Sequence, residues 1–177
     1  MTSNAAVKKL VYCCLWAGTL GASLLLSSCN PNDHPYRVVG SSMLPALRSG
    51  DRVFVDESEK ARSDLHDGDV IVMRHNDTIV MKRILAMPGE TISGVNRKVF
   101  RNGKQIDEPY LAPATSESIP ALITFPTRTV GAGELFVMGD NRDVSADSRL
   151  EKYGAVRSSD VVGKYISTYW HASHGTK

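Results

Sequence analysis

Short apolar runs separated by turn residues make up most of the chain after residue 38. Their members are β-branched or otherwise apolar, and each run has the length of a strand; they cover residues 52–55, 69–74, 78–86 and 134–138. Asn102-Gly103 separates two further runs, and this dipeptide predicts a hairpin because a type I′ turn needs positive φ at both positions. The pattern predicts a mainly β domain over residues 38–170, built on a coiled or closed antiparallel sheet.

Proline marks two segments in which we expect irregular structure. Residues 30–37, NPNDHPYR, hold two prolines and two asparagines and are interpreted as a linker. The segment from Pro109 to Pro126 holds four prolines and little alternation, so it is expected to be an irregular loop. Residues 171–177 contain two of the five histidines and are expected to form a loose tail.

The N-terminal pattern is different, because an uncharged apolar run from Leu10 to Leu26 follows Lys8 and Lys9. Its seventeen residues span about 26 Å as a helix, slightly less than a ~30 Å hydrocarbon core, and the residues up to Cys29 extend it. Residues 10–29 therefore predict one N-terminal hydrophobic helix that anchors the chain in a membrane; a buried core helix is the alternative. The preceding lysines favour a cytoplasmic location for residues 1–9 and an extracytoplasmic one for the rest.

The end of this run offers a second interpretation. Residues 26–29, LSSC, resemble the lipobox of bacterial lipoproteins, in which the cysteine is lipidated after cleavage. Cys29 is thus a candidate lipidation site. An uncleaved anchor is preferred because the apolar run is long for a cleaved signal, but either outcome makes membrane lipid a partner of the chain.

Composition and charge narrow the possibilities further. The 177 residues suit one domain of moderate size. The net charge of +2 is spread along the chain, so nucleic-acid binding is not expected. All three cysteines lie within the first 29 residues, so no disulfide joins parts of the main domain. We expect a monomer.

The candidate catalytic residues are two adjacent serines and one lysine. Ser41 and Ser42 lie in a turn between predicted strands, and serine becomes a nucleophile only with a base in reach. Lys82 lies within the most apolar run and shares a strand face with Val80 and Ile84. A snorkelling lysine is the structural alternative, but burial would lower its pKa and make it a base.

Three segments carry a resemblance to a known family. The segments GSSMLPALRSGD, MKRILAMPGE and GDNRDVSADSR, in this order, resemble the sequence boxes of bacterial type I signal peptidases, the membrane-anchored Ser-Lys proteases. The resemblance implies that Ser42, rather than Ser41, is the nucleophile, that Lys82 is the general base, and that the Ser42 backbone N–H serves the oxyanion hole. The residues that it implies as support for the site are Ser145, Asp147 and Arg149.

The chain departs from the family pattern at two positions, and the third segment permits other interpretations. Gly40 replaces a serine that donates to the oxyanion hole in some members, and Ala46 replaces the usual threonine, which we expect to be a packing change. The third segment could be a solvated loop or a cation site, but it fails the calcium-loop template, and no histidines have HExxH spacing. No metal and no cofactor are expected.

The resemblance implies a serine endopeptidase at the extracytoplasmic face of the bacterial cytoplasmic membrane. Its partners would be exported preproteins whose signal peptides carry small residues at the first and third positions before the cut. Two alternatives remain open at this point: a LexA-like self-cleaving Ser-Lys regulator, and an inactive membrane-tethered lipoprotein of the same fold.

Overall fold

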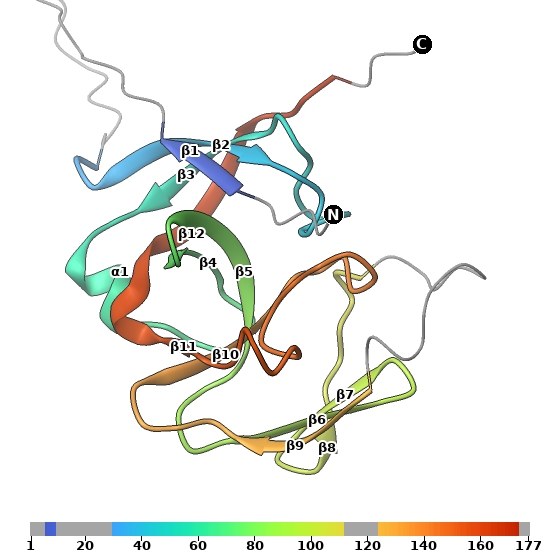
Figure 1. Ribbon diagram of the computed structural model, residues 1–177. Coiled ribbons are helices and arrows are strands. Elements are labelled where there is room, and N and C mark those ends of the chain that lie inside the picture. Colours follow the sequence, from blue (N-terminus) through green and yellow to red (C-terminus); the bar gives the residue numbers. More distant parts are fainter. Residues whose placement is uncertain (1–5, 10–29, 112–123, 174–177) are drawn as a thin grey trace, which may run out of the picture.

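The computed structural model describes residues 6–9, 30–111 and 124–173 (Figure 1). Two antiparallel sheets make up most of this part of the chain. The only helical elements of the described residues are the five-residue α1 (Glu59–Ser63) and the 3-10 turn η2 (Ser158–Asp160). Among these residues no helix has the length and apolar character needed to cross a membrane. The predicted anchor, residues 10–29, lies outside the described residues.

The larger sheet has eight strands in the order β1-β2-β3-β12-β4-β5-β10-β11. They are β1 (Ala6–Lys9), β2 (Asp33–Val39), β3 (Arg52–Asp56), β4 (Val70–His75), β5 (Thr78–Ala86), β10 (Glu134–Met138), β11 (Val156–Arg157) and β12 (Val161–Trp170). The sheet coils until β1 also touches β5, through the single residue pair Ala6–Val80. The expected sheet is therefore coiled, and it is not a closed barrel, because one residue pair does not make a continuous ladder.

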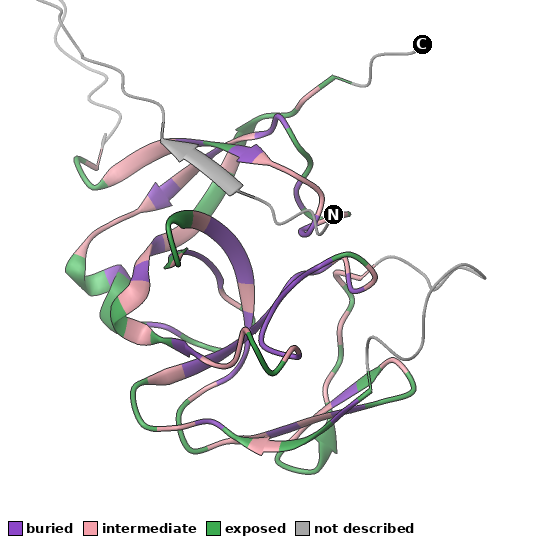
Figure 2. Ribbon diagram, in the orientation of Figure 1, coloured by how far each residue is buried: buried purple, intermediate pink, exposed green. Residues whose placement is uncertain are grey.

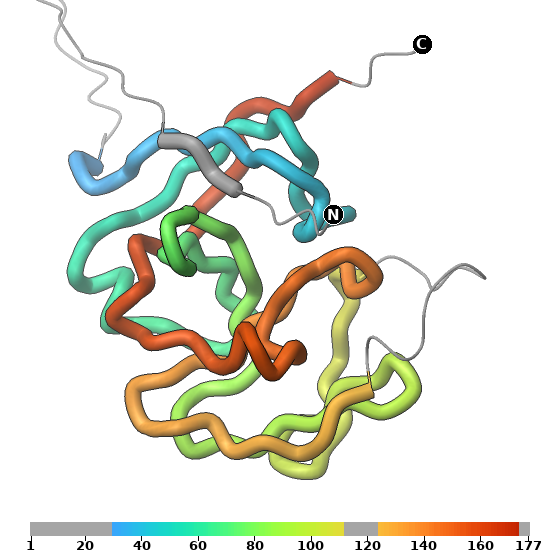
Figure 3. Tube along the Cα trace, in the orientation of Figure 1, coloured from blue at the N-terminus to red at the C-terminus, as the bar shows by residue number. Residues whose placement is uncertain are grey.

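The smaller sheet has four strands in the order β8-β7-β6-β9. They are β6 (Thr91–Val95), β7 (Lys98–Arg101), β8 (Lys104–Gln105) and β9 (Phe125–Thr129). The chain enters this sheet after β5 and returns from β9 to β10 in the larger sheet, so the two sheets are joined at neighbouring strands (Figure 3).

Apolar side chains form three buried clusters along this framework. Figure 2 shows in purple where buried residues lie along the strands. Two clusters lie within the larger sheet, and the third joins β5, β10 and the smaller sheet. Strand β5 contributes to all three, through Met81, Val80 with Ile84, and Leu85 with Ala86. Strand β5 therefore links the three clusters, in agreement with its apolar sequence.

The strands expected from apolar runs are confirmed, with ends that shift by at most one residue. Strands β5 and β10 have the predicted bounds, 78–86 and 134–138. Strand β3 ends one residue later than predicted, and β4 both begins and ends one residue later. The Asn102-Gly103 hairpin is also confirmed: it connects β7 to β8, with φ of 51° and 76° at the two turn residues.

Two segments expected to be irregular contain strands instead. Residues 33–37 of the expected linker belong to β2, which pairs with β3 from Asp33 to Arg37. Residues 125 and 126 of the expected loop belong to β9. Pro126 is tolerated because β9 is an edge strand and the register of its pairing with β6 shifts there, so no ladder bond from this residue is required. Both segments form strands because they pair with other strands of the fold, and local composition gives no information about such pairing.

The expected tail is also ordered at its start. The backbone N–H of Ala172 donates to the buried carboxylate of Asp51 at 2.9 Å. Residues 171–173 therefore lie against the loop that follows β2, and residues 174–177 lie outside the described residues.

Candidate active site

The loop that carries Ser42 leaves the end of β2 and returns to β3. Its two ends are joined by backbone hydrogen bonds, because the Val38 N–H donates to Asp51 and the Gly50 N–H donates to Val38. Gly40 has a φ of 92°, in the left-handed region that glycine adopts without a Cβ penalty. The departure from serine at this position therefore has a backbone reason. Ala46 is exposed, so its replacement of threonine does not alter the core, contrary to the expected packing change.

Lys82 lies in the middle of β5 and is fully buried. Its Nζ is 3.0 Å from the Oγ of Ser42 and 3.1 Å from the Oγ of Ser145. Ser42 is also fully buried, and Ser145 is 9% exposed. Three side chains from three distant parts of the sequence therefore meet at one amine, and the snorkelling alternative for Lys82 is wrong.

The surroundings of Lys82 favour its neutral form. Burial is the largest effect, and it lowers the pKa of the amine to about 8, although the nearby carboxylates of Asp147 and Asp140 act in the opposite direction. The positive charge of Arg149 adds to the lowering. Since the ordinary value is about 10.5, burial makes a deprotonated amine accessible close to neutral pH.

Asp147 and Arg149 form the expected ion pair, and it is buried. The Nε of Arg149 lies 2.8 Å from one carboxylate oxygen of Asp147, and its Nη2 lies 3.0 Å from the other. Arg149 also donates to the backbone oxygens of Arg142 and Ser145, so it fixes the loop that carries Ser145. Burial would raise the pKa of Asp147, but Arg149 outweighs this effect and keeps the carboxyl ionised.

Gly139 is a residue that the sequence interpretation did not single out. A Cβ at this position would lie 2.3 Å from the Oγ of Ser145 and 2.5 Å from the backbone oxygen of Ser42. Its N–H donates to Asp147 at 3.0 Å. Only glycine permits this close approach, and its place at the end of an apolar strand was the available signal.

Partly buried Arg83 and buried Asp140 form a second ion pair beside the lysine. Two parallel hydrogen bonds of 2.9 and 2.7 Å join the guanidinium to the carboxylate. Arg83 follows Lys82 in β5, and Asp140 follows Gly139, so this pair ties β5 to the start of the Ser145 loop. Both residues lie within the quoted motifs, but their pairing needs the fold.

The arrangement is chemically that of a serine nucleophile with a buried amine as its base. The described residues contain no cluster of three or more histidine, cysteine, aspartate or glutamate side chains arranged to hold a metal ion. Cys29, the lipidation candidate, lies outside the described residues.

Comparison with known proteins gives the family. The sequence model described as "Signal peptidase, peptidase S26" matches residues 12–170. The chain belongs to the signal peptidase family, peptidase S26. It is 36% identical over 151 residues to a signal peptidase I of Bacillus amyloliquefaciens, covering 81% of this chain and 78% of that protein. It is 40% identical over 120 residues to signal peptidase I S of Bacillus subtilis (strain 168), covering 65% of each.

A solved structure of a signal peptidase I from Enterococcus faecalis V583 also matches this member of the family. The TM-score is 0.51 and the identity 31%, and the match covers 59% of this chain and 97% of that one. The mainly β fold is therefore that of a signal peptidase, and the chain is a peptidase by family.

Proposed function

We propose that this chain is a membrane-anchored serine endopeptidase that cleaves signal peptides from exported proteins with a Ser42–Lys82 dyad. The observation that carries the proposal is the 3.0 Å contact between the lysine amine and the serine hydroxyl inside a buried site. Family membership supplies the substrate class, because the relatives are named signal peptidase I.

The chemistry follows from the protonation state of the amine. Neutral Lys82 removes the hydroxyl proton of Ser42 as the Oγ attacks the scissile carbonyl carbon. The backbone N–H of Ser42 donates to the resulting oxyanion. The protonated amine then gives its proton to the leaving nitrogen, and the peptide bond breaks to leave an acyl-enzyme. Lys82 next deprotonates a water molecule, which hydrolyses the ester and restores Ser42.

In this proposal Ser145 and the Asp147–Arg149 pair hold the amine in place. A hydrogen bond from Nζ to the Ser145 Oγ directs the amine, and Arg149 binds the backbone oxygen of Ser145 at 3.1 Å. These contacts support the roles that the sequence resemblance implied for the three residues.

Strand β1 suggests where an extended substrate binds. Ala6 pairs with Val39, three residues before Ser42, and with Val80, two residues before Lys82. The facing edges of β2 and β5 therefore accept an extended segment next to the dyad. We propose that the substrate takes the place of β1. If residues 10–29 cross the membrane and residues 1–9 lie in the cytoplasm, β1 leaves this edge open to the substrate.

The test uses adjacent serines as a matched pair. Ser42→Ala and Lys82→Ala should each abolish cleavage of a synthetic signal peptide, with the double variant no worse than either, because residues that act as a unit are not additive. Ser41→Ala should retain activity. Cleavage by Ser42→Ala at a substantial rate would exclude the proposed nucleophile.

The membrane location is a separate part of the proposal. We infer an extracytoplasmic catalytic domain from the lysines that precede the apolar run. In spheroplasts, added protease should degrade residues 30–177 of an epitope-tagged chain, whereas intact cytoplasmic proteins should survive. Full protection of the domain would place it in the cytoplasm and contradict this orientation.

A further inference from the structure

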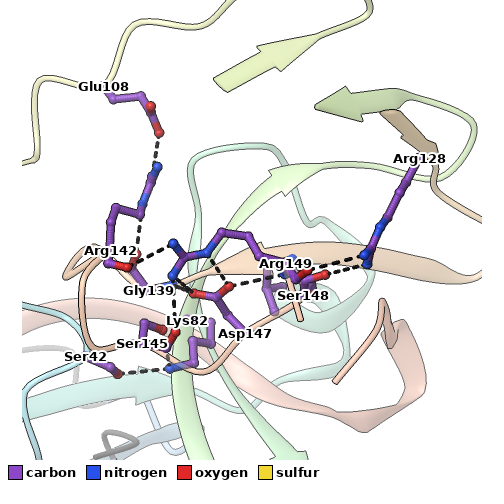
Figure 4. A network of polar contacts seen from close by, with 11 residues as sticks. Ser42, Lys82, Glu108, Arg128, Gly139, Arg142, Ser145, Asp147, Ser148 and Arg149 are labelled. Carbon is purple, nitrogen blue, oxygen red and sulfur yellow. Dashed lines mark hydrogen bonds and ion pairs between the residues drawn. The ribbon is translucent and has the colours of Figure 1, made fainter. Parts of the chain in front are cut away.

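The segment that follows β8 extends from the smaller sheet to the loop that carries Ser145. In Figure 1 it runs upward, in yellow, from the small sheet to the orange loop that follows β10. Glu108 lies in this segment, and its carboxylate oxygen Oε1 accepts a hydrogen bond from Nη2 of Arg142 (Figure 4). The hydroxyl of Tyr110 also donates to this oxygen. The side chains of Glu108 and Arg142 are only 8% and 2% exposed. This ion pair is therefore almost completely removed from water.

Arg142 transmits this contact to the site. Its Nε donates to the backbone oxygen of Gly139 at 3.0 Å. Gly139 lies so close to Ser42 and Ser145 that a Cβ at this position would overlap the Ser145 Oγ. A movement of Arg142 would consequently change the position of Gly139, and so the separation between Ser145 and the lysine amine.

Tyr110 makes a second connection from the same turn. Its ring lies 4.0 Å below the guanidinium of Arg83, the neighbour of Lys82 in β5. Burial and the Glu108 carboxylate raise the pKa of Tyr110, so the hydroxyl stays protonated and can donate to Glu108. One turn therefore contacts both the loop that carries Ser145 and the strand that carries Lys82.

Among Glu108, Arg142 and Tyr110, we expect Glu108 to matter most, because its negative charge pairs with the buried guanidinium of Arg142. Arg142 is buried, and a buried guanidinium that loses its carboxylate partner is strongly unfavourable and tends to move toward water. Within the family motif Arg142 had no implied role, and Glu108 lies outside the three motifs.

We propose that Glu108 is a positioning residue for the dyad: through Arg142 and Gly139 it holds Ser145 at hydrogen-bond distance from the amine of Lys82. The proposal rests on the proposed Ser-Lys function. It adds a requirement that the smaller sheet and its β8 extension be in place for the chemical step, although Glu108 touches neither dyad residue directly.

The experiment compares two carboxylates that each accept a hydrogen bond from a tyrosine. Glu108→Gln and Glu108→Asp are made in the full chain, purified in detergent, and assayed with a synthetic signal peptide. Glu57→Gln is the control, because Glu57 accepts from Tyr36 at 2.7 Å in another part of the fold. Glu108→Gln should lower kcat by about 10- to 100-fold with little change in KM, the size of effect that a small misplacement of catalytic groups produces. Glu108→Asp should recover much of kcat because it keeps the charge, and Glu57→Gln should match wild type.

The outcomes separate this inference from the proposed function. If Ser42→Ala cleaves as fast as wild type, the function itself is wrong. If Ser42→Ala is inactive while Glu108→Gln keeps wild-type kcat, loses activity through KM, or is not rescued by Glu108→Asp, then Glu108 has no positioning role. Should Glu108→Gln not fold, the Tyr110→Phe variant provides the test, because it removes only one hydroxyl. It should lower kcat measurably, by less than about tenfold, without changing KM. An unchanged kcat in Tyr110→Phe would then overturn the proposal.

Discussion

At Lys82, burial and nearby carboxylates act in opposite directions on one amine. Removal from water disfavours the charged form, whereas Asp147 and Asp140 favour it. Burial is the larger effect. Lys82 is therefore suited to act as a base chiefly because it is buried, and the positive charge of Arg149 lowers its pKa further.

The first prediction at the residue scale concerns pH. Because only the neutral amine can accept the Ser42 proton, kcat/KM should rise with pH through an apparent pKa of about 8. The measurement is initial cleavage rate at low substrate concentration across the stable pH range. A controlling pKa of ~6.5, the ordinary histidine value, would contradict a lysine base.

The second prediction concerns stability. Between pH 8 and the ordinary lysine value of 10.5, the unfolded chain binds more protons at Lys82 than the folded chain, so this group makes stability rise with pH. Below that range both states are protonated and the full cost remains, on the order of 3 kcal/mol from a shift of this size. Lys82→Met should therefore be inactive, yet raise the free energy of unfolding near neutral pH by up to this amount, less the hydrogen bonds that it removes.

Urea melts of the full chain at several pH values test this. The gain in Lys82→Met should shrink as the pH approaches 10.5, the value at which the unfolded lysine also loses its charge. Lys98→Met, at an exposed lysine in β7, is the control and should show little change. If Lys82→Met is less stable than wild type at every pH, burial of the lysine amine does not destabilise the folded chain.

At the scale of elements, β9 connects the smaller sheet to the third motif. Arg128 of β9 donates to the backbone oxygens of Ser148 and Arg149, at 3.0 and 3.3 Å (Figure 4). Those oxygens lie next to Asp147, which holds Gly139. Strand β9, whose first two residues were expected to belong to an irregular loop, therefore supports the candidate site from outside the motifs.

The prediction for this element is a loss of stability. Arg128→Met keeps an unbranched side chain but removes both hydrogen bonds to buried backbone, so it should lower the free energy of unfolding by about 1–3 kcal/mol. Thr127→Ala, at the exposed neighbouring position of the same strand, should change it by less than ~0.5 kcal/mol. Chemical denaturation of the two variants and wild type measures this difference. Equal midpoints for all three would mean that β9 does not hold the loop.

At the scale of the whole molecule, the larger sheet carries the candidate site, and the smaller sheet contacts the loop beside it through Arg128. Ser42 and Lys82 come from the larger sheet, and the loop with Ser145 follows β10, the strand to which the chain returns from the smaller sheet. The domain depends on long-range contacts, so the site should be lost as a unit when the fold is lost.

The attachment of this domain to the membrane gives a further prediction. If residues 10–29 are an uncleaved anchor, intact-mass measurement of the purified protein should find the full sequence without lipid, and Cys29→Ser should leave membrane association unchanged. If the segment is a lipoprotein signal, the mature chain should begin at a modified Cys29, and the substitution should block processing. The second result would show that a lipid on Cys29, rather than a transmembrane segment, attaches the chain to the membrane.

The sequence by itself determined the features that depend on local pattern. Alternation and β-branched residues located β3, β4, β5 and β10, because a strand enclosed by the core must be apolar. Asn102-Gly103 located a hairpin, because few residues adopt positive φ. Motif resemblance singled out Ser42, Lys82 and the supporting residues.

Only the tertiary structure decided what lies beside these features. Strands β2 and β9 contain prolines and owe their extended form to partners far along the chain. Glu108 and Arg128 bear no local sign of a role, and Gly139 bears only its place at the end of an apolar strand, since each acts through a partner that the fold brings near. The low pKa of Lys82 likewise comes from desolvation, and the extent of burial is a property of the packed molecule rather than of any short segment.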